Sequence, residues 1–377
     1  MRRGRWFLGA SLVAVGAVAA LASGVAGGPP GGLYRLAGLF GQIVAMVRSS
    51  YVEEVSVDRL EQGAMTALVA AGDPGGAWVA EGQFPAFLEI ATRPLPAFGV
   101  VLGLRSSYPV VLQVVPGSPA ERSGLVRGEL LESVAGEVLR AQPLWRAELR
   151  LAEAERRGEQ VTLQVIDRFL RGKRAVVLAP GEVRVASPAV EDRTNVVVVR
   201  PTAVAGEGAR QLREVLNGLG QRVGVVVDLR GVVLGDRQGA VELAAAVAGG
   251  EVEVPLARRG GAGGSLKARG PNRSWKVVVC IDATTARAGE GAAVALKRAG
   301  ATLIGGQSYG DTGERQAVSV QGGKLWLATT WCLGPDGKGL IGHGLVPDEV
   351  VRMREGEDPV LARALEIAGA GTTRQAA

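Results

Sequence analysis

Histidine and cysteine, the residue types that most often bind zinc, are scarce in this chain of 377 residues. The chain has one histidine, His343, and two cysteines, Cys280 and Cys332, which lie far apart. A zinc site needs several such ligands at short spacings, so the sequence predicts neither a metal site nor any other cofactor. A histidine-based catalytic apparatus would depend on His343 alone.

Charge and composition exclude several classes of protein. The net charge of +6 comes from 43 basic and 37 acidic residues, and three arginines, Arg2, Arg3 and Arg5, belong to the N-terminus. Because phosphate contacts require concentrated positive charge, we expect no nucleic-acid partner. The 56 glycines follow no three-residue period, which excludes a collagen-like chain. The length predicts a folded protein of two or three domains.

Residues 1–32 are predicted to be a signal peptide or a membrane anchor. An arginine-rich start precedes an uncharged stretch over 6–32, which contains FLGASLVAVGAVAALASGVA. About twenty apolar residues are enough to cross a bilayer. Small residues between 20 and 26 fit signal cleavage, whereas the length fits an uncleaved anchor. The positive-inside rule places the rest on the extracytoplasmic face of the membrane, or outside the cell after cleavage.

Residues 33–92 are predicted to form a helical N-terminal region. Apolar side chains recur at helical spacing from Leu33 to Val47, and a second periodic run begins at Val57-Asp58. Neither run carries a catalytic constellation. We therefore expect these helices to pack within the chain or to pair with a second subunit.

Residues 93–170 are predicted to form a small module of strands with one helix, LWRAELRLAEAERR. The segments FGVVLGL and SPAERSGL resemble a PDZ domain of the bacterial protease type. That resemblance implies binding of an extended peptide by strand addition, with loop N–H groups holding a terminal carboxylate. The peptide-binding residues would be Phe98, Gly99, Val100 and Val101. Alternatively, 98–104 is only a core strand.

Residues 171–360 alternate between strands and helices. The strands NVVVVR, VGVVVDLRG and KVVVCID are separated by helical runs, which predicts a largely parallel sheet covered by helices. The fold class is thus α/β and α+β. The glycine-rich stretch 260–270 is expected to be a flexible surface segment, and 361–377 a tail. Cys280 and Cys332 lie in apolar runs and would either pair or remain free.

The order of these segments resembles the carboxyl-terminal processing (tail-specific) serine peptidases. The similarity extends from 33 to 355 through YVEEV, GDPGGAWV, the PDZ-like module, VGVVVDLRG, KVVVCIDATTARAGE and GLIGHGLVPDEVV. It implies a ClpP/crotonase-like core that cuts unfolded or tail-presented proteins outside the cytoplasm. The family uses a serine nucleophile, a supporting glutamine and a lysine base, which desolvation keeps neutral.

The catalytic residues of that family do not carry over. Glu290 matches the glutamate of the family's SASASE-like run, which puts Arg287 at the nucleophile position. The base position holds Asp311, and Gln316 matches the supporting glutamine if one residue is inserted. The oxyanion loop DLRNNPGG reads DLRGVVLG at 228–235. Because the family side chains at the first two positions meet, Arg287 and Asp311 would form a salt bridge; alternatively, both face solvent independently.

Other groups could replace the dyad only by a rearrangement. The nearby hydroxyls are those of Thr284, Thr285 and Ser308, and the nearest amine is that of Lys297. None of these pairs has the dyad spacing.

The sequence therefore predicts an exported or membrane-tethered pseudopeptidase that binds polypeptide C-termini or unfolded segments. A second copy of the chain or an active relative is a further expected partner, and the N-terminal segment would contact the membrane. The first alternative is an active serine-type endopeptidase with a rearranged nucleophile and base. The second is a structural envelope protein.

Overall fold

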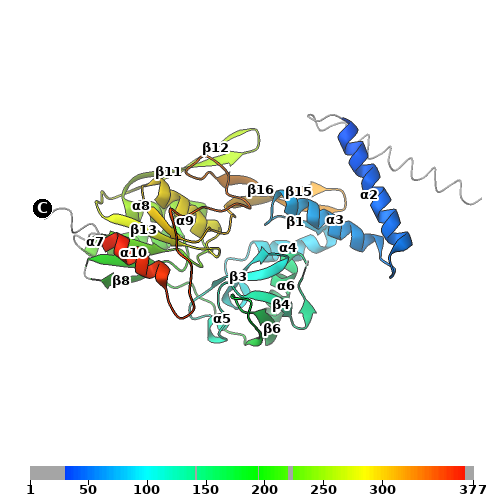
Figure 1. The fold of residues 1–377 in the computed structure, drawn as a ribbon, viewed down its shortest axis with the longest axis horizontal. Coiled ribbons are helices and arrows are strands. Elements are labelled where there is room, and N and C mark those ends of the chain that lie inside the picture. Colours follow the sequence, from blue (N-terminus) through cyan, green and yellow to red (C-terminus); the bar gives the residue numbers. More distant parts are fainter. Residues whose placement is uncertain (1–29, 141, 194, 220–223, 370–377) are drawn as a thin grey trace, which may run out of the picture. The chain divides into compact units, whose positions relative to one another are not determined.

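A computed structural model describes residues 30–140, 142–193, 195–219 and 224–369 (Figure 1). The chain divides into two compact units, residues 1–67 and 68–377. Most of the expected signal or anchor segment falls outside the described residues. Among those that are described, no helix has the length and apolar character needed to cross a membrane.

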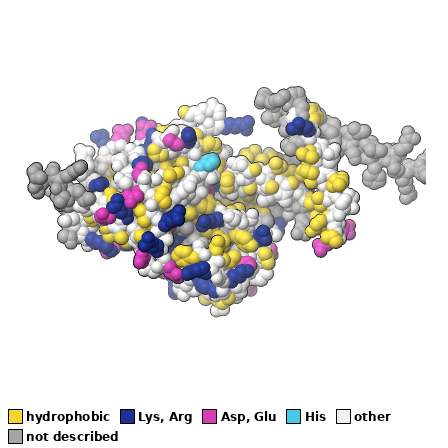
Figure 2. Space-filling view, in the orientation of Figure 1, with side chains coloured by type: hydrophobic (Ala, Val, Ile, Leu, Met, Phe, Trp, Pro, Cys, Tyr) yellow, Lys and Arg dark blue, Asp and Glu magenta, His cyan; other side chains and the backbone are white. Residues whose placement is uncertain are grey.

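The first unit contains α2 (Pro30–Ser50) and most of α3 (Val57–Gly72), as the periodicity predicted. Most large apolar side chains of α2 are exposed, and Figure 2 shows hydrophobic side chains along this helix. They are Tyr34, Leu39, Phe40, Ile43 and Met46. A helix with this much exposed apolar surface presents an unpartnered face.

The segment after α3 is not helical throughout, contrary to the prediction for 33–92. It forms β1 (Ala77–Ala80), a 3-10 turn and α4 (Phe84–Ala91). β1 pairs antiparallel with β16 (Gly323–Cys332), from Ala77 opposite Trp326 to Ala80 opposite Gly323. A single strand cannot satisfy its backbone hydrogen bonds alone. Because the paired residues lie 243 to 249 positions apart in the sequence, local periodicity could not reveal this pairing.

A small mixed module, here called the β2–β7 module, follows. Its strands are β2 (Val100–Arg105), β3 (Tyr108–Val114), β4 (Leu130–Val134), β5 (Glu137–Val138), β6 (Val161–Ile166) and β7 (Lys173–Leu178). Their order is β2-β3-β4-β6-β7, with β5 beside β4. Helices α5 (Pro119–Arg122) and α6 (Leu144–Arg157) complete it. The sheet therefore extends beyond the predicted boundary at 170.

The second unit is built on a six-stranded core sheet. Its order is β17 (Glu349–Val350), β14 (Thr302–Gly305), β13 (Lys276–Ile281), β10 (Gly224–Asp228), β9 (Val196–Arg200) and β8 (Ala189–Arg193). All neighbours are parallel except β8 and β9. Valines fill the central strands because a covered parallel sheet is buried on both faces.

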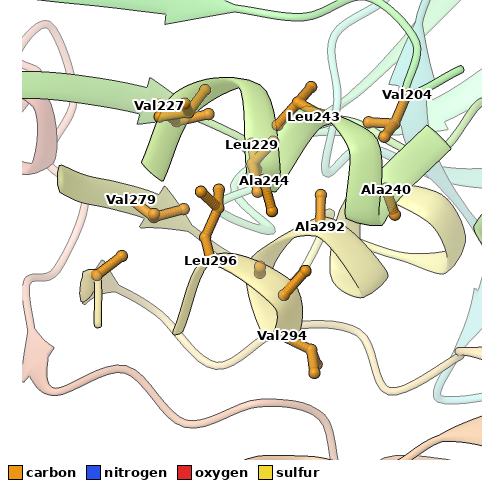
Figure 3. Packing of buried hydrophobic residues seen from close by; sticks show 14 of the residues in the cluster. Val204, Val227, Leu229, Ala240, Leu243, Ala244, Val279, Ala292, Val294 and Leu296 are labelled. Atoms are coloured by element: carbon orange, nitrogen blue, oxygen red, sulfur yellow. The ribbon is translucent and has the colours of Figure 1, made fainter. Parts of the chain in front are cut away.

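Helices cover both faces of this sheet. One face packs against α7 (Gly206–Gly218), α8 (Arg237–Ala248) and α9 (Arg287–Arg298). Figure 3 shows Leu243 and Ala244 of α8 beside Leu296 of α9, over Val227 and Val279 of the strands. The other face packs against α10 (Pro359–Gly369).

Two segments predicted to be irregular are ordered. Residues 361–369, expected in the tail, form most of α10, because Val360, Ala364 and Ala368 recur every fourth residue and are buried against the sheet. The glycine-rich stretch forms β12 (Gly261–Gly270), which pairs with β11 (Gly250–Arg258). β11 joins β16, beside β15 (Gly313–Val320), in a second sheet. Cys280 and Cys332 are buried and unpaired.

Candidate active site and peptide groove

The predicted nucleophile position lies at a strained backbone turn. β13 leads through a tight turn into α9, whose first residue is Arg287, with φ of +48°. Its N–H donates to the carbonyl oxygen of Asp311 at 2.8 Å. A non-glycine residue pays for a left-handed backbone, and a strained strand-to-helix turn is how some hydrolases present a nucleophile. Here the turn presents a guanidinium instead.

The predicted Arg287–Asp311 ion pair is confirmed. Arg287 Nε lies 3.7 Å from Asp311 Oδ2, and the arginine side chain is 47% exposed whereas the carboxylate is 7% exposed. The two positions that resemble the family's nucleophile and base are thus brought together. They carry an electrostatic contact and no group that can attack a carbonyl.

Asp311 has a stronger partner that the sequence analysis missed. Arg315 donates to both Asp311 oxygens at 2.9 and 3.2 Å, and to both Asp73 oxygens at 2.6 and 3.0 Å. Asp73 also accepts the N–H groups of Gly75 and Ala328. The only sign of this cluster in the sequence is that Asp73, Asp311 and Arg315 are charged residues in apolar or turn-rich segments.

Gln316 lies apart from this pair. It sits on β15 opposite Leu327 and is exposed. The neighbouring Arg315 points inward to Asp311, and alternate residues of a strand point to opposite faces. The structure therefore places an arginine, and not the glutamine, beside the predicted base position.

Glu290 anchors the loop that carries Asp311. It is fully buried and accepts hydrogen bonds from the Ser308 hydroxyl, from Gly310 N at 2.9 Å and from Asp311 N at 2.6 Å. Burial raises the pKa of Glu290 to about 7, although these hydrogen bonds oppose the shift. The residue matched by the resemblance is thus a scaffold of the loop.

The other hydroxyls near the site are already engaged. Thr285 Oγ1 donates to the carbonyl oxygen of Leu229 at 3.0 Å, and Thr284 Oγ1 donates to Asp282. Ser308 donates to Glu290 and accepts from the N–H of Leu345 at 2.6 Å.

The amine proposed for a rearranged dyad is engaged as well. Lys297 Nζ pairs with both oxygens of Asp348 at 2.6 Å. The amine of Lys297 is thus paired with a carboxylate and not with a hydroxyl group that it could deprotonate.

The loop that resembles the oxyanion loop is filled by the β2–β7 module. The N–H groups of Val233 and Leu234 donate to Gln113 Oε1 at 2.8 and 3.0 Å, and Gln113 Nε2 donates to the carbonyl oxygen of Thr202 at 2.6 Å. Gln113 is buried within the apolar run PVVLQVV. A buried amide in such a run needs partners, which was the signal that could have revealed it.

Apolar side chains extend this contact. Val101, Val110 and Leu112 of the module pack with Val233 and Ala286, the residue before Arg287. Opposite the end of β2, the Tyr309 hydroxyl accepts from Leu104 N at 2.8 Å and donates to Leu104 O at 3.1 Å.

A second carboxyl group faces the guanidinium of Arg287. Glu148 of α6 is partly buried, and desolvation raises its pKa to about 7 although Arg287 opposes the shift. The predicted dyad positions therefore hold an arginine, Arg287, and a carboxylate, Asp311, and the cation Arg315 pairs with that carboxylate.

The predicted peptide-binding residues lie together at the start of β2. Phe98 and Gly99 have φ of +54° and +78°, and Val100 begins the strand. Within the described residues β2 pairs only with β3, so its outer edge is unpaired. The side chains of Phe98, Val100 and Val101 are buried, which means that peptide contacts there would be made by backbone. Both readings of 98–104, core strand and groove strand, fit this geometry.

Among the described residues no group of three or more His, Cys, Asp or Glu side chains could hold a metal ion. His343 is exposed on the surface shown in Figure 2.

Comparison with known proteins agrees with this architecture. Residues 195–351 match the model of peptidase family S41. The carboxy-terminal processing protease CtpB of Bacillus subtilis (strain 168) is 24% identical over 320 residues, which cover 81% of this chain and 66% of that protein. The structure of a photosystem II D1 C-terminal processing protease has a TM-score of 0.63 and 18% identity, covering 82% of this chain and 86% of the other.

The structural similarity covers 82% of this chain, and the family match, over residues 195–351, includes the strands and loops that carry Arg287 and Asp311. The chain is thus related to the carboxyl-terminal processing peptidases, and residues 195–351 match peptidase family S41.

Proposed function

We propose that this chain is a catalytically inactive member of its family that binds polypeptide tails or unfolded segments. The observation that carries the proposal is the pairing of Asp311 with Arg315 and Arg287 at the predicted dyad positions. A guanidinium cannot act as nucleophile, and a carboxylate held by two cations has no serine to activate. Removal of one oxyanion donor alone costs about 2.7–4 kcal/mol of transition-state stabilisation, and here both dyad groups are replaced too.

The location and partners follow from the sequence. The N-terminal segment would place the chain on the extracytoplasmic face of the membrane as an anchor, or release it after cleavage. The module resembling a PDZ domain would bind polypeptide by strand addition to β2. The exposed apolar face of α2 supports pairing with a second copy or with an active relative.

The test is proteolysis by the full chain in detergent, with unfolded casein as the probe. We expect the casein to remain uncleaved, with no new fragments in mass spectra after many hours. An active family member run in parallel should cleave it. The same preparation should bind immobilised casein.

Cleavage that disappears in Thr285→Ala or Ser308→Ala would overturn the proposal in favour of a rearranged active site. Absence of both cleavage and binding would instead favour a structural role. Cleavage that survives both substitutions would point to a contaminating peptidase, which a second purification tag resolves.

A further inference from the structure

The loop that precedes β2 has the geometry of an anion-binding turn. Phe98 and Gly99 both have positive φ. Successive N–H groups in such a turn point toward one side and bind anionic oxygens. This is the feature that would hold the terminal carboxylate of a bound peptide.

In this chain the turn already holds a carboxylate. Phe98 N donates to Glu155 Oε1 at 2.7 Å, and Glu155 Oε2 accepts from Arg93 Nη2 at 2.6 Å. Glu155 lies in the last turn of α6, with 21% of its side chain exposed. The carboxylate thus has a backbone donor on one oxygen and a cation on the other.

The remaining donors of the turn are also satisfied. Gly99 N donates to Pro96 O at 3.1 Å, and Val100 N donates to Ala97 O. A chain end entering this loop would have to displace Glu155, which would leave that carboxylate without its backbone donor. Charge-assisted hydrogen bonds of this kind are among the stronger ones.

The edge of β2 beyond the loop is less restricted. Leu104 directs its N–H and C=O to Tyr309, away from β3. By the two-residue alternation of a strand, Leu102 directs its backbone groups to the same edge. An extended segment can therefore pair with Leu102 without placing its own end in the loop, whereas at Leu104 it would have to displace the Tyr309 hydroxyl.

We propose that Glu155, held by Arg93, is an internal occupant of the carboxylate loop, so that the groove takes extended polypeptide segments regardless of a free C-terminal carboxylate. This inference rests on the proposed binding of polypeptide at β2. It makes Glu155 a specificity-determining residue that selects against recognition of chain ends and in favour of internal stretches.

The experiment compares the full chain in detergent with two variants, Glu155→Ala and Glu153→Ala. Glu153 is the matched control, because it lies on the same helix and, in the part of the chain that the structure describes, its ion pair is with Arg150, at 3.7 Å. The probe is an array of peptides of about ten residues, printed once with free C-termini and once with C-terminal amides.

We expect the parent chain and Glu153→Ala to bind the two formats equally well. Glu155→Ala frees Phe98 N and Arg93, so it should prefer the free acids by about tenfold, the equivalent of one charge-assisted hydrogen bond. A parent chain that already prefers free acids as strongly as Glu155→Ala would overturn the inference.

Hydrogen–deuterium exchange at the Phe98 amide tests, without any ligand, whether Glu155 occupies the loop. The amide should be protected in the parent chain and in Glu153→Ala, and exchange faster in Glu155→Ala. Equal exchange in all three proteins would overturn the occupancy by Glu155. If none of the three proteins binds any peptide although the Phe98 amide is protected as expected, the proposed polypeptide binding and this ligand class are overturned. The contact between Glu155 and Phe98 would then still be established.

Discussion

Two arginines of the second unit each bridge two aspartates, and their surroundings differ. Arg230 binds Asp228 at 2.6 and 2.8 Å and Asp358 at 2.8 Å, and the second carboxylate is 39% exposed. Arg315 binds Asp73 and Asp311, whose side chains are each no more than 8% exposed.

The two clusters also differ in what they join. The first lies in the DLR segment that resembles the family and connects β10 to the start of α10. The second includes the predicted base position and connects a loop after α3 to β15. The position that resembles the family's catalytic lysine, Asp311, thus belongs to a buried ion cluster, whereas the cluster around Arg230 keeps one partly exposed carboxylate.

Loss of Arg315 should have the largest effect. Arg315→Leu leaves two buried carboxylates without their cation, so we expect the free energy of unfolding to fall by about 3–5 kcal/mol. Denaturant titration measures it. The triple variant with Asp73→Asn and Asp311→Asn should recover a large part of the loss. A single variant as stable as the parent would contradict the role given to this cluster.

Loss of Arg230 should lower the free energy of unfolding by a smaller amount. Arg230→Leu leaves Asp358 able to bind water and Asp228 near Arg200, whose Nε lies 3.9 Å away. We expect a loss of about 2–3 kcal/mol in the same titration, below the penalty for a fully stranded buried pair. The comparison between the clusters fails if Arg230→Leu proves more damaging than Arg315→Leu.

The buried Glu290 should make stability depend on pH. Its folded pKa of about 7 lies above the ordinary 4.5, so the folded state binds more protons between these values and the free energy of unfolding falls as pH rises through that window. We expect a fall of up to about 3 kcal/mol from this group across the window.

Glu290→Gln is the matched variant for that prediction. It keeps an acceptor for the loop N–H groups but cannot ionise, so the difference in unfolding free energy between variant and parent should shift in favour of the variant as pH rises. Parallel pH profiles for the two proteins would rule out the titration of Glu290.

Changes at Arg287 should have the smallest effect. Its guanidinium is 47% exposed and lies 3.7 Å from Asp311, so Arg287→Ala should lower stability by less than about 1 kcal/mol. Arg287→Gly removes the same ion pair but relieves the left-handed backbone, and should be more stable than the alanine variant by roughly 1 kcal/mol. Equal stabilities would show that the turn carries no strain.

Much of the fold was predictable because it depends on local patterns. The valine runs 196–199 and 225–227 form the buried parallel strands that composition indicated, and the helical periodicity of 144–157 produced α6. The meeting of Arg287 with Asp311 followed from the family resemblance.

The rest depends on contacts between distant segments. Asp73 and Arg315 are 242 residues apart, and Gln113 meets Val233 across 120 residues. No local period reports such pairs, because they exist only after the module and the core pack together. β1 was missed for the same reason, since its partner strand lies near the other end of the chain.

The cluster around Arg315 also affects whether substitutions could restore the family's serine and lysine at positions 287 and 311. A lysine placed at 311 would face Arg315 and Arg287, and like charges at short range in a buried site repel strongly. Installing a serine at 287 as well leaves Arg315 beside the new amine, with Asp73 as its one remaining carboxylate. If catalysis is lost as proposed, each single step toward a working dyad would pass through a less stable protein, and the ion cluster would oppose a return of the family's catalytic residues.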